Sequence, residues 1–401
     1  MLLYVLCITL SIVAQSDLSQ QVKIYHNGKV TNQLTIDSIT VEETSGPVIP
    51  GKNWVILGGY TDENNNYQRS VIYNGVEIAP KLNAPDDPNP EYPYNYQAAL
   101  YDGTDLYILG YRLVKDAISG GVNYRFAVWK NHEYLYGLVP NLTGPYPTGF
   151  DVDNGNVYIY GICYDSNYEY EKGFYIKNQG TPVVKSDKIR GFDVYNDEVA
   201  YVTEFYTNLH YHSSNKAWEW VPVWQLFYKG NSDIIQSVDR SKRHWVQDMK
   251  IRNGIPYIVG YTDGYDDNGN MVYSVAYYNG TTFSNISHEQ YKRLEGRLIT
   301  HDEQGNVYLL CYAENEGVYV VLKNGTFMYE MAASEGFDVL RIVDRSAHSI
   351  AVNGTDVYVS GREISKEKDS NGDHIYNGIL WKNGEIIWRR ENGKIDNIYI
   401  Y

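Results

Sequence analysis

One short pattern recurs throughout the chain, a run of apolar and aromatic residues that ends in Asn-Gly or in a polar substitute for it. The copy at residues 377–385 reads NGILWKNGE. Such a run predicts a strand that enters a tight turn, because Asn-Gly adopts the positive φ angles that short hairpins require. A chain that repeats one strand so often is built from repeated units. Related copies begin at Val22, Ser70, Phe126, Gly173, Gln225, Ser274 and Tyr319.

A second strand pattern precedes most of these copies and sets the period of the repeat. It reads WVILGGY at Trp54, LYILGYR at Leu106 and VYVSGRE at Val357. One position of this strand recurs at residues 59, 110, 161, 204, 260, 311 and 361, at intervals of 51, 51, 43, 56, 51 and 50. A period near fifty residues that contains several short strands is typical of a β-propeller. A further strand before and another after complete a four-stranded meander, which is one blade.

We therefore expect an all-β fold in which residues 22–401 form a single β-propeller of four-stranded blades. Residues 22–28 resemble the third strand of a blade that lacks its first two strands, and the chain ends in DNIYIY, which resembles a second strand. Pairing these fragments would close the ring through the N- and C-terminal strands. Seven complete blades, or eight with one incomplete, both fit the sequence, and seven is the commoner arrangement.

The blades resemble those of secreted bacterial β-propeller repeat proteins, whose blades have the form VYVxG…WKNG. The resemblance covers nearly all of residues 22–401, but the motif is structural and occurs in proteins of many functions. The kelch pattern is met in part, since a Gly-Gly doublet followed by an aromatic residue occurs once, at residues 58–60. The Ser-x-Asp-x-Gly-x-x-Trp box of sialidase-like propellers is absent.

The beginning of the chain predicts export. Residues 2–14 are an apolar run that is too short to span a bilayer but suits a signal peptide of residues 1–16, with Ala14 and Ser16 at the cleavage site. No Lys or Arg precedes this run, and a buried first strand is the alternative. We expect a monomer that is secreted, periplasmic or on the cell surface, without membrane insertion after cleavage. The net charge of -15 argues against nucleic acid as a partner. Cys163 and Cys311 are expected to be buried and free.

The sequence contains few signals for metal binding or catalysis. The loop DSNGD offers Asp369, Asn371 and Asp373 as oxygen ligands for calcium, although a solvated hairpin turn requires the same residues and is the preferred interpretation. His210 and His212 alternate on one strand, as a zinc pair would, but no third ligand is identifiable. Nucleophile elbows, phosphate-binding loops and dinucleotide-binding motifs are missing. We expect no metal and no cofactor.

One blade departs from the repeat and supplies the candidate binding residues. Residues 206–224 predict a long hairpin that turns near residues 213–216, with Trp218, Trp220 and Trp224 on one face and with His210 and His212 opposite them if the turn has an odd length. Exposed tryptophans would stack on sugar rings or anchor a protein, whereas buried ones would pack on a neighbouring blade. The preferred function is therefore a non-catalytic exported propeller that binds an extracellular glycan or protein through one ring face. The alternative is a polysaccharide hydrolase or lyase with carboxylates, His or Tyr near the central channel.

Overall fold

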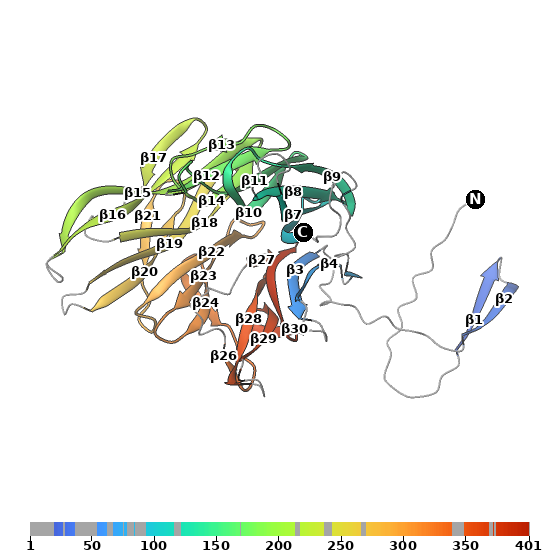
Figure 1. Ribbon diagram of the computed structural model, residues 1–401. Helices are drawn as coiled ribbons and strands as arrows, with labels where there is room; N and C mark the ends of the chain where they lie inside the picture. Colours follow the sequence, from blue (N-terminus) through green and yellow to red (C-terminus); the bar gives the residue numbers. More distant parts are fainter. Residues whose placement is uncertain are drawn as a thin grey trace. The chain divides into compact units, whose positions relative to one another are not determined.

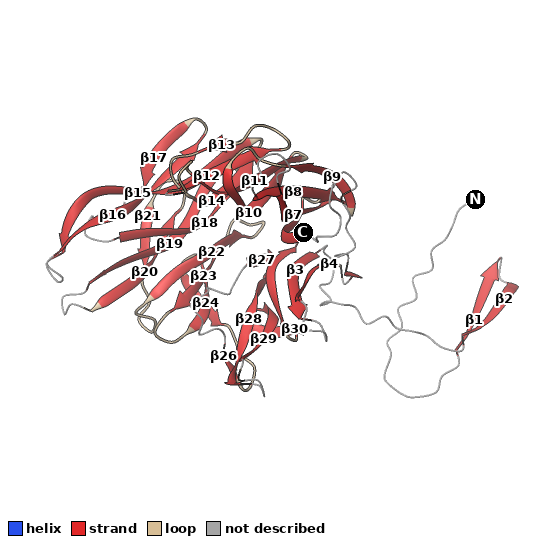
Figure 2. Cartoon of the chain, in the orientation of Figure 1, coloured by secondary structure: helices blue, strands red, loops and turns tan. Residues whose placement is uncertain are grey.

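The structure is a computed structural model of the 401-residue chain. The residues that it describes are 20–26, 29–36, 54–61, 67–74, 76–77, 84, 94–115, 122–168, 170–212, 217–235, 243–265, 270–338, 349–368, 372 and 374–400. For residues 20–26, 29–36, 205–212 and 217–222 only the backbone is described, and no residue of 1–16, the predicted signal peptide, is among the described residues. Every regular element in this part of the chain is a strand, as Figure 2 shows. No described helix is long and apolar enough to cross a membrane.

The chain divides into two compact units, Met1–Thr44 and Ser45–Tyr401. In the first unit, β1 (Gln20–His26) and β2 (Lys29–Ile36) pair as an antiparallel hairpin. The second unit holds the repeated blades (Figure 1). The predicted domain began at residue 22, so it included the hairpin that belongs to the first unit.

Seven four-stranded antiparallel sheets form the β-propeller within the described part of the second unit, which confirms the predicted fold. Blade 1 contains β31 (Gly393–Ile400), β3 (Trp54–Thr61), β4 (Tyr67–Tyr73) and β5 (Val76–Glu77). Blade 2 contains β6 (Asn95–Tyr101), β7 (Leu106–Lys115), β8 (Val122–Lys130) and β9 (Glu133–Leu138). Blade 3 contains β10 (Thr143–Asp153), β11 (Asn156–Tyr164), β12 (Glu171–Lys177) and β13 (Val183–Val184). Blade 4 contains β14 (Ile189–Tyr195), β15 (Glu198–His212), β16 (Ala217–Tyr228) and β17 (Asn231–Ile235).

The remaining blades follow the same order from the inner strand to the outer one. Blade 5 contains β18 (Arg243–Arg252), β19 (Ile255–Tyr265), β20 (Met271–Tyr278) and β21 (Phe283–Ile286). Blade 6 contains β22 (Leu294–His301), β23 (Val307–Ala313), β24 (Val318–Lys323) and β25 (Thr326–Glu330). Blade 7 contains β27 (Ser349–Asn353), β28 (Asp356–Lys368), β29 (His374–Lys382) and β30 (Glu385–Arg390), and the short β26 (Phe337–Asp338) also pairs with β28.

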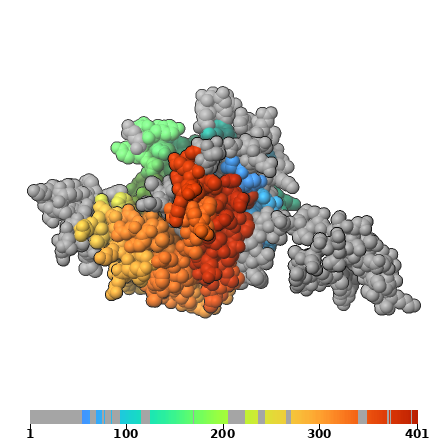
Figure 3. Space-filling model, turned by 90° about the horizontal axis from the view of Figure 1, so that it is seen from below, coloured from blue at the N-terminus to red at the C-terminus, as the bar shows by residue number. Residues whose placement is uncertain are grey.

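The ring closes in blade 1, where the C-terminal strand β31 pairs with β3 from Tyr60 opposite Gly393 to Trp54 opposite Ile400. Figure 3 shows the C-terminal residues in red next to the blue residues of this blade. Closure by strands from the two ends of the propeller was predicted from the sequence. The N-terminal contribution comes from β3 to β5, however, and the strand at Val22 pairs with β2 instead.

The hydrophobic core lies between consecutive blades rather than inside any one of them. Each buried cluster joins two neighbours in the ring, and the cluster of Trp54, Ile56 and Ile398 with Tyr358 and Leu380 joins blade 1 to blade 7. A blade is therefore covered on both faces by its neighbours, which is why the second strands, such as β23, are buried along nearly their whole length. A single blade could not bury these faces alone.

The recurring glycine of the second strand permits a bulge in the inner strand beside it. The register between inner and second strands shifts opposite this position, between Pro147 and Gly149 in blade 3 and between Val246 and Asp248 in blade 5. A Cβ added to Gly161 would collide with the carbonyl oxygen of Tyr146, and one added to Gly260 would collide with that of Trp245. The glycine is therefore required for close backbone approach.

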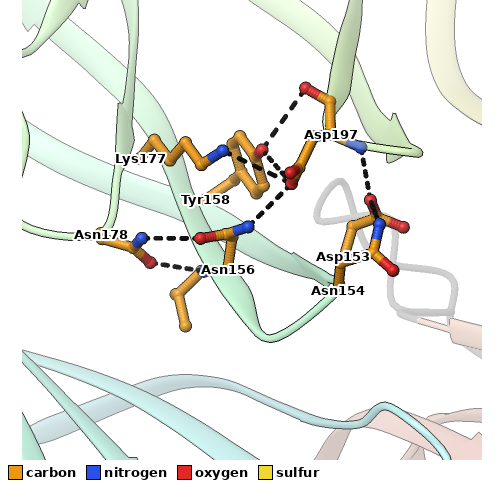
Figure 4. A network of polar contacts seen from close by, with 8 residues as sticks. Asp153, Asn154, Asn156, Tyr158, Lys177, Asn178 and Asp197 are labelled. Atoms are coloured by element: carbon orange, nitrogen blue, oxygen red, sulfur yellow. Dashed lines mark hydrogen bonds and ion pairs between the residues drawn. The ribbon is translucent and has the colours of Figure 1, made fainter.

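The turn that follows the third strand of a blade is hydrogen-bonded to the beginning of the second strand, and we call this contact the clip. Figure 4 shows it for blade 3. Asn178 adopts a φ of 51°, its side-chain Oδ1 accepts a hydrogen bond from the Val157 N–H at 2.8 Å, and its own N–H donates to the Val157 carbonyl at 2.7 Å. Lys177 lies over the Tyr158 ring at 5.4 Å, opposite it in the register. The same pair of bonds is made to the beginning of the neighbouring second strand, at Leu106, Val307 and Val357, by Asn131, Asn324 and Asn383.

Candidate functional site

The inner strands line a central channel that contains a cavity of about 390 Å³. Residues of β6, β10, β18, β22, β27 and β31 form its wall, together with Tyr160 of β11. The wall is polar at this level, so the cavity is not part of the hydrophobic core. Its polar lining residues are Thr148, Tyr160, Asp248, Lys250, Thr300, His301, Ser349, Asn397 and Tyr399.

Three aspartates of consecutive inner strands connect each blade to the next. Asp151 accepts a hydrogen bond at 2.9 Å from the backbone N–H of Val194 in blade 4. Asp193 in turn accepts one from the N–H of Ile251 in blade 5. Asp248 accepts one at 3.0 Å from the N–H of Ile299 in blade 6. The carboxylates thus satisfy buried backbone donors across the blade boundaries, which is a structural role.

The same aspartates surround the ammonium group of Lys250. Burial disfavours the charged form of this lysine, but the carboxylates of Asp193, Asp248 and Asp151 outweigh it and raise the pKa of Lys250. Burial, together with the neighbouring Asp193, raises the pKa of Asp151 well above its usual range. Burial also raises the pKa of Asp248. Lys250 is therefore the fixed positive charge of the channel, and it makes no hydrogen bond with any residue that the structure describes.

His301 lies at the end of β22 and lines the same cavity. Burial lowers its pKa to about 4, and the positive charges of Arg252 and Lys250 act in the same direction. The imidazole is consequently neutral at pH 7. Its ring packs edge-on against Tyr257 at 4.4 Å, and its Nε2 has no hydrogen-bond partner among the described residues.

A second hollow of about 290 Å³ continues the cavity toward the other end of the channel. It shares Thr148, Tyr160 and Asp248 with the cavity, and it adds Lys188, Arg190 and Gln247. Lys188 and Arg190 lie at or next to the beginning of β14, on the side of the ring where one blade is connected to the next, and Gln247 lies in the middle of β18. We call this side of the ring the loop face. The opposite side carries the tight Asn-Gly turns.

The residues predicted to bind a ligand lie elsewhere, in the hairpin of β15 and β16. Trp224 is fully buried at 0% exposure and packs on Phe283 at a ring distance of 5.1 Å, so it belongs to the core between blades 4 and 5. The structure therefore supports packing, not ligand stacking, for this tryptophan. The side chains of Trp218, Trp220, His210 and His212 lie outside the described residues.

The backbone register of this hairpin corrects one prediction. The strands are separated by residues 213–216, an even number, and the pairing places His210 opposite Glu219 and His212 opposite Ala217. Trp218 is opposite Tyr211 and Trp220 is opposite Leu209. The histidines and tryptophans are therefore not cross-strand partners.

The predicted metal ligands are not tested by the structure. Asp369, Asn371 and Asp373 lie outside the described residues. Within the described ranges, no group of three His, Cys, Asp or Glu side chains is arranged to hold a metal ion. Cys163 and Cys311 are both free and buried, as predicted.

Sequence reasoning missed the channel residues, although a signal for two of them was present. Asp151 and Asp193 occupy the same place in two of the three copies of Gly-Phe-Asp-Val, those at residues 149–152 and 191–194. A charged residue repeated inside an otherwise apolar inner strand is expensive to bury without partners. That repetition could have indicated a shared polar position in the channel. Asp248 and Lys250 do not belong to such a repeated sequence, so no repetition indicated their position in the channel.

Comparison with known proteins adds little to this geometry. No protein-family model matches the chain, and no curated protein matches it. Among solved structures, a Bombyx mori GH32 beta-fructofuranosidase aligns with 78% of this chain and 94% of its own at 11% identity and a TM-score of 0.30. A mannose phosphorylase from Leishmania mexicana aligns with 54% of this chain and 79% of its own at 9% identity and a TM-score of 0.30. Similarity this low carries no inference about function.

Proposed function

We propose that the protein is an exported, non-catalytic β-propeller that binds a carbohydrate in the central channel. The observation that carries this proposal is the polar cavity of about 390 Å³, into which Lys250 projects without a hydrogen-bond partner among the described residues. A volume of this size falls in the range of small-molecule sites, which run from about 300 to 1,000 Å³. Polar groups left without partners in such a cavity favour a ligand that can supply them.

A sugar matches the chemistry of the wall. Asp248 and Lys250 are two residues apart on β18, so strand alternation places an acceptor and a donor on the same side of the strand. Sugar hydroxyls donate to a carboxylate and accept from an ammonium group, and neighbouring hydroxyls can do both at once. The rings of Tyr160 and Tyr399 offer apolar surface for the C–H faces of the sugar.

The distribution of carboxylates favours binding over hydrolysis. Glycosidases place two carboxyl groups on either side of the scissile bond, roughly 5 to 9.5 Å apart. Asp248 is the acidic residue that lines both hollows, and no second acidic residue lines either of them in the described part of the chain. Asp151 and Asp193 lie outside both linings, and each accepts a hydrogen bond from the backbone of the next blade.

A polysaccharide hydrolase or lyase is the second candidate. Asp151 favours it, because burial and Asp193 raise the pKa of its carboxyl group, which is the direction that a general acid requires. His301 is neutral and lines the cavity, so it could accept a proton. This candidate requires Asp151 to become accessible to substrate.

Two parallel assays on the purified mature protein separate the candidates. A glycan array and a set of soluble polysaccharides are each incubated with the protein, and bound protein and newly released reducing ends are measured. We expect the protein to bind glycans on the array and to release no new reducing ends from the polysaccharides. Release of new ends that is abolished by Asp151→Asn would instead establish the enzyme.

A further inference from the structure

Six tyrosines gather on the loop face of blades 2 and 3, and we call them the tyrosine platform: Tyr111, Tyr124, Tyr146, Tyr164, Tyr168 and Tyr170. The first three form a mutual cluster. The Tyr146 ring is edge-on to Tyr111 at 5.2 Å and to Tyr124 at 6.2 Å, and the Tyr111 and Tyr146 hydroxyls are 3.3 Å apart. These rings are half-buried. They pack together at the junction between the two blades.

The other members of the platform extend into solvent. Tyr168 and Tyr170 are 64% and 67% exposed and lie in the connection between β11 and β12. The Tyr168 ring is 5.8 Å from that of Tyr164 and lies against Gly144, where an added Cβ would approach it to 3.3 Å. Packing does not explain two large aromatic side chains that are both mostly exposed in one short loop.

The loop holds Tyr168 in a strained backbone conformation. Its φ is +60°, a left-handed value that a bulky aromatic residue rarely adopts. The strain is maintained by hydrogen bonds, since the Tyr168 N–H donates to the Asp165 carbonyl at 3.1 Å and the Asp165 N–H donates to the Tyr170 carbonyl at 3.1 Å. Glycine or asparagine would adopt this φ at lower cost. Strain of this kind is concentrated at ligand-binding positions, where a side chain must point in one direction.

The platform is continuous with the channel. Tyr146 is two residues from Thr148 on β10, and Thr148 lines both hollows. A second connection runs through Glu171, which accepts a hydrogen bond from the Tyr164 hydroxyl at 3.5 Å and from the Lys188 ammonium at 2.7 Å. Lys188 lines the hollow at the loop face. A chain that leaves the channel over blade 3 would therefore reach the platform.

We propose that the tyrosine platform is a second sugar-binding subsite, so that the ligand is a linear oligosaccharide or polysaccharide with one unit in the channel. The inference rests on the proposed function and adds the substrate class to it. Aromatic rings bind the C–H face of a sugar by stacking, and the exposed hydroxyls of Tyr168 and Tyr170 add hydrogen bonds.

The experiment compares monosaccharides with oligosaccharides of increasing length, using neutral and acidic hexose series and isothermal titration. Wild-type affinity should rise with length once a chain spans both subsites. The double variant Tyr168→Ala and Tyr170→Ala should lose about 5- to 30-fold in affinity for the longest oligosaccharides and keep its affinity for monosaccharides. Tyr168→Phe keeps the ring and removes one hydroxyl, so it should lose less affinity than the double alanine variant. Tyr376→Ala, at an exposed tyrosine of blade 7, is the control that should bind as the wild type does.

A further variant separates binding from folding. Tyr168→Gly removes the ring and relieves the positive φ, so it should leave the melting temperature unchanged or raise it while losing the affinity for long oligosaccharides. A lowered melting temperature with unchanged affinity would show a structural role and overturn the inference. Equal affinities of the double alanine variant and the wild type for the longest chains would also overturn it, without affecting the channel. Failure of the wild type to bind any monosaccharide or oligosaccharide would contradict the proposed function itself.

Discussion

At the scale of single residues, the repeated Asn of the Lys-Asn-Gly turn explains why the sequence pattern recurs. Asn tolerates the positive φ of the turn. Its side-chain Oδ1 accepts a hydrogen bond from a backbone N–H at the beginning of the second strand, and its own backbone N–H donates to the carbonyl of the same residue, as Asn178 does with Val157. The preceding lysine covers the tyrosine at the start of that strand, as Lys177 covers Tyr158. The two motifs VY and KN are therefore two halves of one contact.

We expect Asn178→Ala to destabilise the protein by about 1 to 3 kcal/mol, because the Val157 N–H loses its acceptor and alanine is strained at this φ. Asn154→Ala is the matched control. Asn154 has a φ of 51° in the same blade, but it is exposed and its side chain bonds only to Asp153. Chemical denaturation of both variants measures the difference. Equal destabilisation would show that φ strain alone, and not the clip, accounts for the effect.

His301 makes the stability of the protein depend on pH. Its pKa is about 4 in the folded state against 6.5 for the free side chain, so between these values the unfolded chain binds a proton that the folded chain does not. The contribution of His301 to stability is present above pH 6.5 and is lost as the pH falls to 4. His301→Asn should remove this loss. Urea denaturation at pH 7, 5 and 4 should show that the free energy of unfolding decreases more for the wild type than for His301→Asn. Equal decreases in the two proteins would exclude His301 as the cause.

At the scale of elements, the long hairpin of β15 and β16 combines a core segment with a segment that extends past the other blades' second strands. Strand alternation placed three tryptophans on one face of β16, but alternation does not say what covers that face. Trp224 is covered by blade 5, while Trp218 and Trp220 lie nearer the turn of the hairpin. The sequence therefore predicted the hairpin but not which of its tryptophans are buried.

We expect Trp224→Ala to cost about 3 to 5 kcal/mol, because it removes a fully buried ring and leaves a cavity. The double variant Trp218→Ala and Trp220→Ala tests the predicted exposed platform. If that platform exists, the double variant should melt near the wild-type temperature and lose partner binding. Thermal melts of both variants make the comparison. If the melting temperature of the double variant falls as far as that of Trp224→Ala, an exposed platform is excluded.

At the scale of the whole molecule, the repeat pattern predicted the propeller and its closure but not the strand that β31 joins. Residues 22–28 carry the same local strand signal as β4, and a pairing between Trp54 and Ile400 is too distant in sequence for local patterns to reveal. The channel site escaped prediction for a related reason. Which inner-strand residues face the channel depends on the bulges, such as the one between Val246 and Asp248, and these set the side-chain direction at Asp248 and Lys250.

Deletion of residues 396–401 should destabilise the entire ring by more than about 4 kcal/mol, because it removes the buried Ile398 and the hydrogen bonds of β31 to β3. It also exposes a strand edge, which promotes aggregation. Deletion of residues 1–44 is the control, since all seven blades form without this unit. Melting temperatures measure both effects. An unchanged melting temperature after the C-terminal deletion would contradict closure through β31.

The central claim is that the channel cavity binds sugar through Lys250 and its neighbours. It is tested most directly by the dissociation constant of the best glycan from the array, measured for the wild type, Lys250→Met, Asn397→Ala and the surface control Lys292→Met. Asn397 lines the cavity without being part of the charged cluster, so its variant remains informative if loss of Lys250 impairs folding. We predict that the dissociation constant increases about tenfold or more in Lys250→Met and Asn397→Ala and does not change in Lys292→Met. Wild-type affinity in both folded channel variants would contradict the claim.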